Sequence, residues 1–169
     1  MKTRRKNNKL IILFNLIVSV LFLLPIRTLN LFDENYSTLS LTTRGYLYVL
    51  FLGFIIGILL SYETLLISSF KNAILIFLSL IIGTMVPHHI PYNFQGNLHL
   101  LFAYIGFVGL VIATIINCRI KKYRDIYLLF IFIAVILYLK FGMVNTISEI
   151  VVMMATLYIN MFLVLKKKN

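Results

Sequence analysis

The chain has 169 residues, of which 61% are apolar and 12% are charged, and its mean hydropathy is +0.98. Soluble domains are only about half apolar and need a continuous polar surface. The composition therefore excludes a water-soluble globular fold. It predicts an all-α polytopic membrane protein, because helices satisfy their own backbone hydrogen bonds in lipid.

The net charge of +11 could suggest a nucleic-acid partner, but the positions of the basic residues argue against one. They lie at the chain ends and between apolar runs, where they orient helices and meet anionic lipid head groups. They form no continuous basic face. We expect membrane lipids as partners, and no nucleic acid.

Six apolar runs follow one another along the chain. A helix of roughly 20 residues spans a hydrocarbon core of about 30 Å, so six helices use almost the whole chain. The sequence predicts a single transmembrane domain over residues 1–169, a bundle of about six helices without a separate soluble domain. The predicted spans are 10–26, 46–62, 72–86, 98–117, 126–139 and 146–165.

The first run follows five basic residues within the first nine, an arrangement also found in secretory signals. The run is longer than a typical signal core and ends at Leu-Leu-Pro-Ile-Arg, without a small-residue cleavage site. We therefore interpret it as a retained first helix.

The polar segments between the runs predict the orientation. Residues 27–45 form the longest of them and are expected outside, as is the segment after Pro87, which ends the third span because proline lacks an amide donor. With the amino terminus inside, 13 of the 16 lysines and arginines lie on the inner side. This bias predicts that both termini are cytoplasmic. The many Lys, Ile and Asn residues are typical of an AT-rich bacterial gene, so we expect a bacterial cell membrane.

Small residues predict where helices pack closely, since lipid gives no hydrophobic drive for association. Gly53 and Gly57 form a GxxxG pattern in the second span, and Gly109 and Ala113 have the same spacing in the fourth. We expect a packing role for them. Asn160 lies within the last span, where a bond between helices is worth about 0.6 to 2 kcal/mol. It is predicted to make such a bond.

Three histidines lie in or near the segment between the third and fourth spans: His88, His89 and His99. Imidazoles can bind zinc or haem iron, and three within one hairpin could approach one ion. However, adjacent His88 and His89 point apart in many backbone conformations, and no acid or cysteine lies beside them. Hydrogen-bonding histidines are the simpler interpretation, so no cofactor or metal is predicted, and a metal or haem site is the alternative.

Two acids lie close to lipid depth, Glu63 at the inner end of the second span and Glu149 at the outer start of the last. An acid within a membrane is a functional candidate because its charge is costly there. Both are predicted near interfaces, where Glu63 could pair with Lys71, and Glu149 with Lys140 or Arg44. Structural pairing is the simpler interpretation, and proton coupling the alternative.

Motifs for common enzyme chemistry are missing. The sequence contains no GxxxxGK[ST], no HExxH and no GxSxG, and no convincing pair of carboxylates. The single cysteine, Cys118, cannot form a disulfide within the chain. No catalytic residue is predicted, although a membrane enzyme could still assemble a site from separate loops.

Several short motifs outside the common enzyme patterns occur in a recognisable order along the chain. They are Asn35-Tyr36-Ser37, Leu39-Ser40, Gly83 to Pro87, His99-Leu100, Ala103, Phe107 and Glu149. This order resembles a six-helix family of bacterial membrane proteins of unknown function, related to the eukaryotic damage-regulated autophagy modulators. The resemblance covers most of the chain as a layout and implies a compact six-helix bundle with a shared core at its external loops and His99. It also implies lipid handling or membrane-protein scaffolding, without enzymatic residues to carry over, and the doubled His88-His89 departs from the pattern.

Three functions are compatible with these features. The leading one is a non-enzymatic scaffold, partner or lipid-interacting subunit, with a membrane protein or a second copy of the chain as a possible partner. The second is a small transporter or channel subunit that uses Glu63, Glu149 or the histidines. The third is a metal- or haem-binding membrane protein.

Overall fold

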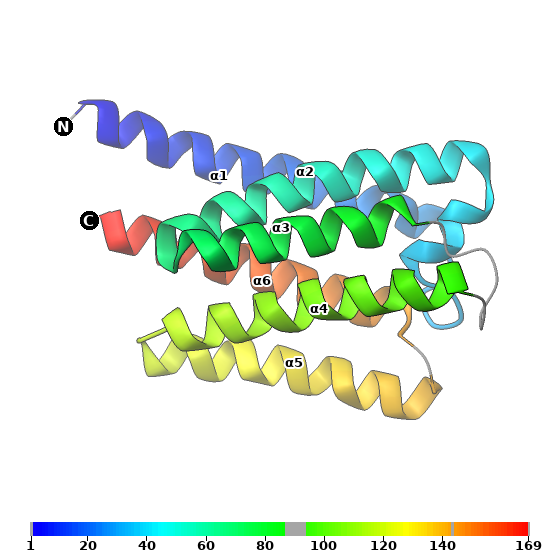
Figure 1. Ribbon diagram of the computed structural model, residues 1–169. Helices are drawn as coiled ribbons and strands as arrows, with labels where there is room; N and C mark the ends of the chain where they lie inside the picture. Colours follow the sequence, from blue (N-terminus) through cyan, green and yellow to red (C-terminus); the bar gives the residue numbers. More distant parts are fainter. Residues whose placement is uncertain (1, 87–93, 143, 169) are drawn as a thin grey trace.

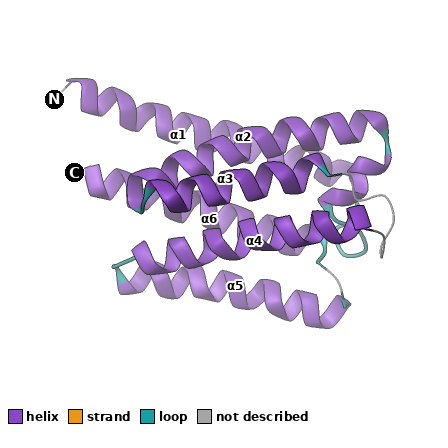
Figure 2. Cartoon of the chain, viewed as in Figure 1, coloured by secondary structure: helices purple, strands orange, loops and turns teal. Residues whose placement is uncertain are grey.

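The computed structural model describes residues 2–86, 94–142 and 144–168. This part of the chain is all-helical and contains no strand (Figure 2). It forms six α-helices and two short 3-10 helices, so the predicted all-α class and the six helices are confirmed. Their bounds are α1 Lys2–Leu23, η1 Leu24–Arg27, η2 Tyr36–Leu41, α2 Thr43–Ile67, α3 Phe70–Met85, α4 Phe94–Asn117, α5 Lys121–Phe141 and α6 Thr146–Lys168.

Four of the helical segments are long and apolar enough to cross a membrane, namely those over 8–27, 43–67, 96–117 and 146–167. The helix α3 is apolar but has only 16 residues, which at about 1.5 Å per residue falls short of a full hydrocarbon core. The helix α5 has 21 residues, but charged residues stand near both of its ends. The fold is therefore compatible with a multi-pass membrane protein.

The helices run up and down, so that α1 begins and α6 ends at the same end of the bundle (Figure 1). We call this the terminal end, and it also holds the turns at 68–69 and 118–120. The opposite end, called the loop end, holds η1, η2 and the start of α6. The helices pack as neighbours in the pairs α2–α3, α3–α4 and α5–α6, and α6 also packs on α1 and α2. Within the described ranges α4 and α5 make no extended contact, although they follow each other in the chain.

Local sequence explains where several helices begin and end. Thr42 and Ser69 are N-caps whose hydroxyls accept the backbone N–H of Gly45 at 3.0 Å and of Asn72 at 3.3 Å. Gly142 ends α5 in a left-handed conformation with φ of 69°, which favours glycine.

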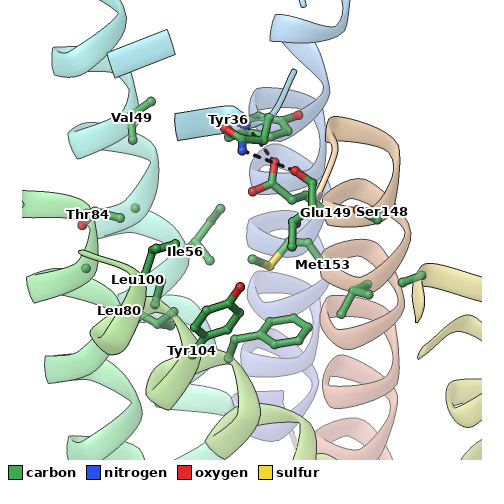
Figure 3. A pocket seen from close by; sticks show the side chains of 18 of the residues that line it. Tyr36, Val49, Ile56, Leu80, Thr84, Leu100, Tyr104, Ser148, Glu149 and Met153 are labelled. Atoms are coloured by element: carbon green, nitrogen blue, oxygen red, sulfur yellow. Dashed lines mark hydrogen bonds between the residues drawn. The ribbon is translucent and has the colours of Figure 1, made fainter. Parts of the chain in front are cut away.

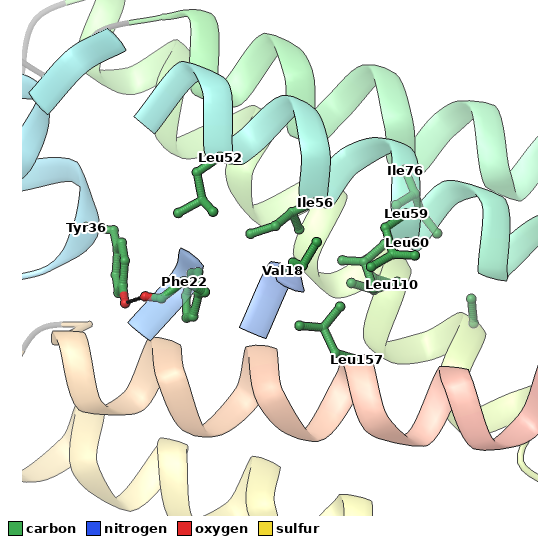
Figure 4. Close-up of a cluster of buried hydrophobic side chains, with 11 residues drawn as sticks. Val18, Phe22, Tyr36, Leu52, Ile56, Leu59, Leu60, Ile76, Leu110 and Leu157 are labelled. Atoms are coloured by element: carbon green, nitrogen blue, oxygen red, sulfur yellow. Dashed lines mark hydrogen bonds between the residues drawn. The ribbon is translucent and has the colours of Figure 1, made fainter. Parts of the chain in front are cut away.

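Two apolar clusters fill the bundle, one above the other along its axis. The loop-end cluster consists of Val18, Phe22, Tyr36, Leu52, Ile56, Leu59, Leu60, Ile76, Leu110, Ala113 and Leu157 (Figure 4). The terminal-end cluster consists of Ile11, Ile67, Cys118, Tyr127, Ala155, Ile159, Leu163 and Val164. Members from α1, α2 and α6 occur in both clusters, so these three helices surround a common core.

Close packing of α2, α3 and α4 depends on glycines. A Cβ atom at Gly53 would lie 2.3 Å from Thr84 Cγ2, and one at Gly57 would lie 3.3 Å from Ile81 Cδ1. The GxxxG pattern of α2 therefore faces α3. Gly83 allows an equally close crossing of α3 and α4, where an added Cβ would meet the backbone nitrogen of Ala103 at 3.2 Å.

Candidate functional site

A cavity of about 570 Å³ lies in the half of the bundle next to the loop end. Its walls come from α2, α3, α4, α5 and α6, with Tyr36 of η2 and Glu149 of α6 close to one another on its border (Figure 3). Most of the lining is apolar. The side chains that define the walls include Ile56, Leu80, Leu100, Tyr104, Val135 and Met153.

The cavity exists because two helix hairpins do not close on each other. The α3–α4 pair packs on α2, and α5 packs on α6, which leaves a gap between α4 and α5. Small residues leave space in the walls of the cavity, which Gly53, Gly83, Ala103 and Ala134 line. Of the residues in α5, only Tyr127 and Ala134 are buried, so this wall of the cavity is a single helix with little support from its neighbours.

Hydrogen bonds close the bundle at the loop end. The backbone carbonyl of Glu34 accepts the Thr146 N–H at 2.6 Å and the Thr146 hydroxyl at 2.8 Å. The Ile147 N–H donates to the Leu31 carbonyl at 3.1 Å, and the Asn35 side chain donates to the Val144 carbonyl at 3.3 Å. The first connecting segment is thus attached to the start of α6 and covers the bundle there.

Glu149 holds this cover in place from the first turn of α6. Its Oε2 atom accepts the Tyr36 backbone N–H at 2.8 Å, so the expected ion pair with Lys140 or Arg44 is wrong. A backbone amide is its partner instead, because η2 begins directly over the start of α6. Glu149 is partly buried and borders the cavity. Within the described part of the chain its second oxygen, Oε1, makes no hydrogen bond.

Tyr36 joins three parts of the loop end. Its ring stacks on Phe22 with centroids 4.3 Å apart, and its hydroxyl donates to the Phe22 carbonyl. Burial raises the pKa of this hydroxyl well above its usual value, and the nearby Glu149 carboxylate and Tyr48 raise it further. The neutral phenol is therefore the form that the folded chain holds.

Of the three histidines in the predicted cluster, the structure describes only His99. His99 is partly buried at the start of α4, with its Nδ1 2.9 Å from the Val86 carbonyl, and it borders the cavity. His88 and His89 lie outside the described residues. Among the residues that are described, no group of three His, Cys, Asp or Glu side chains could hold a metal ion.

Glu63 lies deeper than the sequence suggested. Its side chain is fully buried, and its Oε1 accepts the Asn15 side-chain N–H at 2.6 Å. The expected pairing with Lys71 at an interface is wrong, because α2 extends to Ile67 and Lys71 is exposed on α3. Asn15 was not predicted as a site residue. A lone amide within an apolar run is the sequence feature that could have identified it.

The remaining predicted packing residues lie at helix contacts. An added Cβ at Gly109 would be 3.7 Å from Ile76, an ordinary contact distance, and Ala113 belongs to the loop-end cluster. Asn160 is fully buried, and its Oδ1 accepts the Thr114 hydroxyl at 2.9 Å. This bond joins α4 to α6.

No family model, curated protein or solved structure matches this chain. The resemblance to the six-helix bacterial family therefore stays a prediction based on the residues quoted above.

Proposed function

We propose that this chain is a non-enzymatic integral membrane protein that binds a membrane amphiphile in the cavity between α4 and α5. The observation that carries the proposal is the cavity itself, an apolar space of about 570 Å³ with a carboxylate on its border. Ligand pockets usually measure about 300 to 1,000 Å³ and combine apolar walls with a few polar groups.

The membrane placement is supported by the outer surface of the bundle. Large apolar side chains are exposed along the helices, for example Phe51 on α2, Leu101 on α4 and Phe132 on α5. Exposed apolar surface on this scale is unfavourable in water and suits lipid. The bias of basic residues toward the terminal end supports a cytoplasmic location for that end, and for both termini, in a bacterial cell.

The polar groups at the cavity define the head group of the ligand. The carboxylate of Glu149 keeps Oε1 without a hydrogen bond in the described part of the chain, and Glu149 is partly exposed there. It can accept a hydrogen bond from a hydroxyl or an ammonium group, whereas it repels a phosphate or a carboxylate. The ligand is therefore an amphiphile with an alkyl chain and a hydrogen-bond donor as its head.

Access from the lipid side fits this ligand. The loop end is closed by the contacts of residues 31–36 with α6, whereas α4 and α5 leave a gap in the wall. An amphiphile can enter sideways from the surrounding lipid without passing through water.

A photoreactive long-chain alcohol, presented to the protein in liposomes, tests the proposal. We expect it to crosslink to residues lining the cavity, and the fatty acid of equal chain length to crosslink about tenfold less because of its charge. Leu100→Trp fills part of the cavity and should abolish this crosslinking. Leu101→Trp, at the next position and on the exposed surface, is the matched control and should not. Equal labelling of both variants would contradict the proposal.

The role of Glu149 is tested with Glu149→Gln, whose amide oxygen can still accept the Tyr36 N–H. A hydrogen bond to a charged group is worth about 1.5 to 3 kcal/mol, so we expect the alcohol to bind about tenfold more weakly, and the preference over the fatty acid to disappear. Unchanged selectivity in a folded variant would show that Glu149 does not contact the head group.

A further inference from the structure

A second polar region lies in the middle of the bundle, away from the cavity. Asn15 of α1, Glu63 and Thr64 of α2, Thr114 of α4 and Asn160 of α6 are each fully buried. We call these residues the polar layer. Along the chain, each polar residue stands between a member of the terminal-end cluster and a member of the loop-end cluster, as Asn15 stands between Ile11 and Val18. The five side chains therefore lie at similar depth.

Hydrogen bonds within the polar layer leave three oxygens without partners. The Asn15 amide nitrogen donates to Glu63 Oε1 at 2.6 Å and to the Ile11 carbonyl at 3.0 Å, which uses both of its hydrogens. In the described part of the chain, Glu63 Oε2, Asn15 Oδ1 and Thr64 Oγ1 are buried and have no partner, and neither has the Asn160 amide nitrogen, Nδ2. Buried polar atoms are normally bonded, and each one that is not needs an explanation.

A negative charge on the buried Glu63 carboxylate would also need an explanation. A carboxylate that is removed from water costs several kcal/mol unless a cation lies beside it, and the described side chains place none there. The titratable groups nearest to this depth are tyrosines: Tyr62 and Tyr158 are exposed on the outside of the bundle, and the hydroxyl of buried Tyr127 lies 2.9 Å from the Thr156 hydroxyl. The described charged or ionisable side chains of the other helices that pack on α2 lie mainly near the helix ends, namely Lys9, Lys71, His99, Glu149, Lys166 and Lys167. Buried Cys118 follows α4 in the terminal-end cluster.

We propose that Glu63 is a buried proton-binding site, in which Oε2 carries a proton and donates it to Asn15 Oδ1. One proton then supplies the missing donor, satisfies two of the three oxygens, and removes the buried charge. The carboxyl and amide groups face each other already through the bond between Oε1 and Nδ2, so the second bond completes a pair. A metal cation fits less well, because it needs several oxygen ligands and the described side chains of the polar layer offer only these three unpartnered oxygens.

The proton exchanges with the terminal end. Asn8 lies two helical turns before Asn15 on the same face of α1, and its Oδ1 is also buried without a partner among the described residues. Toward the loop end, by contrast, the larger apolar cluster covers Glu63. A site of this kind can load and release a proton from one side of the membrane, which is a function separate from amphiphile binding.

Dicyclohexylcarbodiimide tests the proposal on the full-length protein in liposomes, because this apolar reagent modifies protonated carboxyl groups within membranes. The acid proton moves to a carbodiimide nitrogen, the carboxylate oxygen bonds to the central carbon, and rearrangement gives a stable acylurea. We expect peptide mass mapping to find the modification on Glu63. Glu63→Gln should lose it, and Glu34→Gln, the same change at the loop end, should retain it.

Infrared spectroscopy provides a second readout that does not depend on a variant. The wild-type protein should show the carbonyl band of a protonated acid, and the band should shift in heavy water because the proton exchanges. No modification of Glu63 together with no acid band would overturn the proposal. Protection of Glu63 by sodium chloride, but not by choline chloride, would overturn it in favour of a sodium site. An acid band that does not shift would overturn the exchange with the terminal end.

Discussion

Tyr36 shows how one side chain at the loop end connects elements that are distant in sequence. Its hydroxyl is neutral, buried and bonded to the Phe22 carbonyl, and its backbone N–H is bonded to Glu149. The pKa of the hydroxyl is raised by burial above the value of about 10 that it has in the unfolded chain. The contribution of Tyr36 to stability is therefore complete below about pH 10 and is lost as the pH rises further, because the unfolded chain releases this proton first.

The variant Tyr36→Phe removes both the bond and this titration. At neutral pH we expect it to lose about 1 kcal/mol of stability, the usual contribution of one hydrogen bond. Above about pH 10, where the unfolded phenol titrates, the wild type should lose stability more steeply than the variant. Thermal unfolding in detergent across this pH range measures the difference, with exposed Tyr62→Phe as the control. Parallel curves for the wild type and Tyr36→Phe would contradict the pKa argument.

The two acids also show what single residues reveal before a structure exists. Their position in apolar runs marks Glu63 and Glu149 as unusual, and both lie at polar contacts in the bundle. Their partners could not be predicted, because Asn15 is 48 residues from Glu63 and Tyr36 is 113 residues from Glu149. Charge alone favours lysine or arginine as the partner. At a buried position an amide is the more favourable partner, because an amide can be buried at a lower cost than a lysine.

At the scale of helices, the apolar runs and their breakers predict the elements well. Pro25 converts the end of α1 into a 3-10 turn, and α3 ends at Met85, two residues before Pro87. The packing faces are harder to predict, because every span contains small residues. Gly53 and Gly57 face α3, but the close approach of α3 to α4 uses Gly83 and Gly106, which the spacing rule does not mark.

Glycines at close and loose contacts should respond differently to substitution. An alanine Cβ at Gly53 would lie 2.3 Å from Thr84 Cγ2, so Gly53→Ala should cost about 1 to 3 kcal/mol through overpacking. Gly109→Ala meets only an ordinary contact and should be neutral or stabilise the helix by about 0.5 to 1 kcal/mol. Chemical unfolding in detergent measures both. Adding Thr84→Ala removes the closest atom and should restore part of the loss at Gly53, and equal stability of the two single variants would rule out the close α2–α3 contact.

For the whole molecule, the sequence predicts six helices with both ends on one side, but not which helices leave a gap. Neighbours in the chain are normally neighbours in space. Here α4 and α5 are an exception, because they follow each other across the 118–120 turn but do not pack together. Instead, α4 packs on α3 and α5 packs on α6. The cavity is a consequence of this arrangement and has no local sequence signal. Ala103 and Ala134, which line it, are unremarkable as single residues.

The topology of the whole chain depends on the two helices with the weakest membrane signal. With 16 residues, α3 is short, and α5 carries charges near both ends. If both cross the membrane, Asn30 and Lys140 lie outside, while Ser69 and Arg119 lie inside.

Single cysteines at these four positions, in a chain with Cys118→Ser, should react with a membrane-impermeant maleimide according to this division. Asn30→Cys and Lys140→Cys should be labelled in intact cells, and Ser69→Cys and Arg119→Cys only after permeabilisation. Labelling of Lys140→Cys only after permeabilisation would mean that α5 does not cross, and labelling of Ser69→Cys in intact cells would reverse the orientation that the basic residues predict.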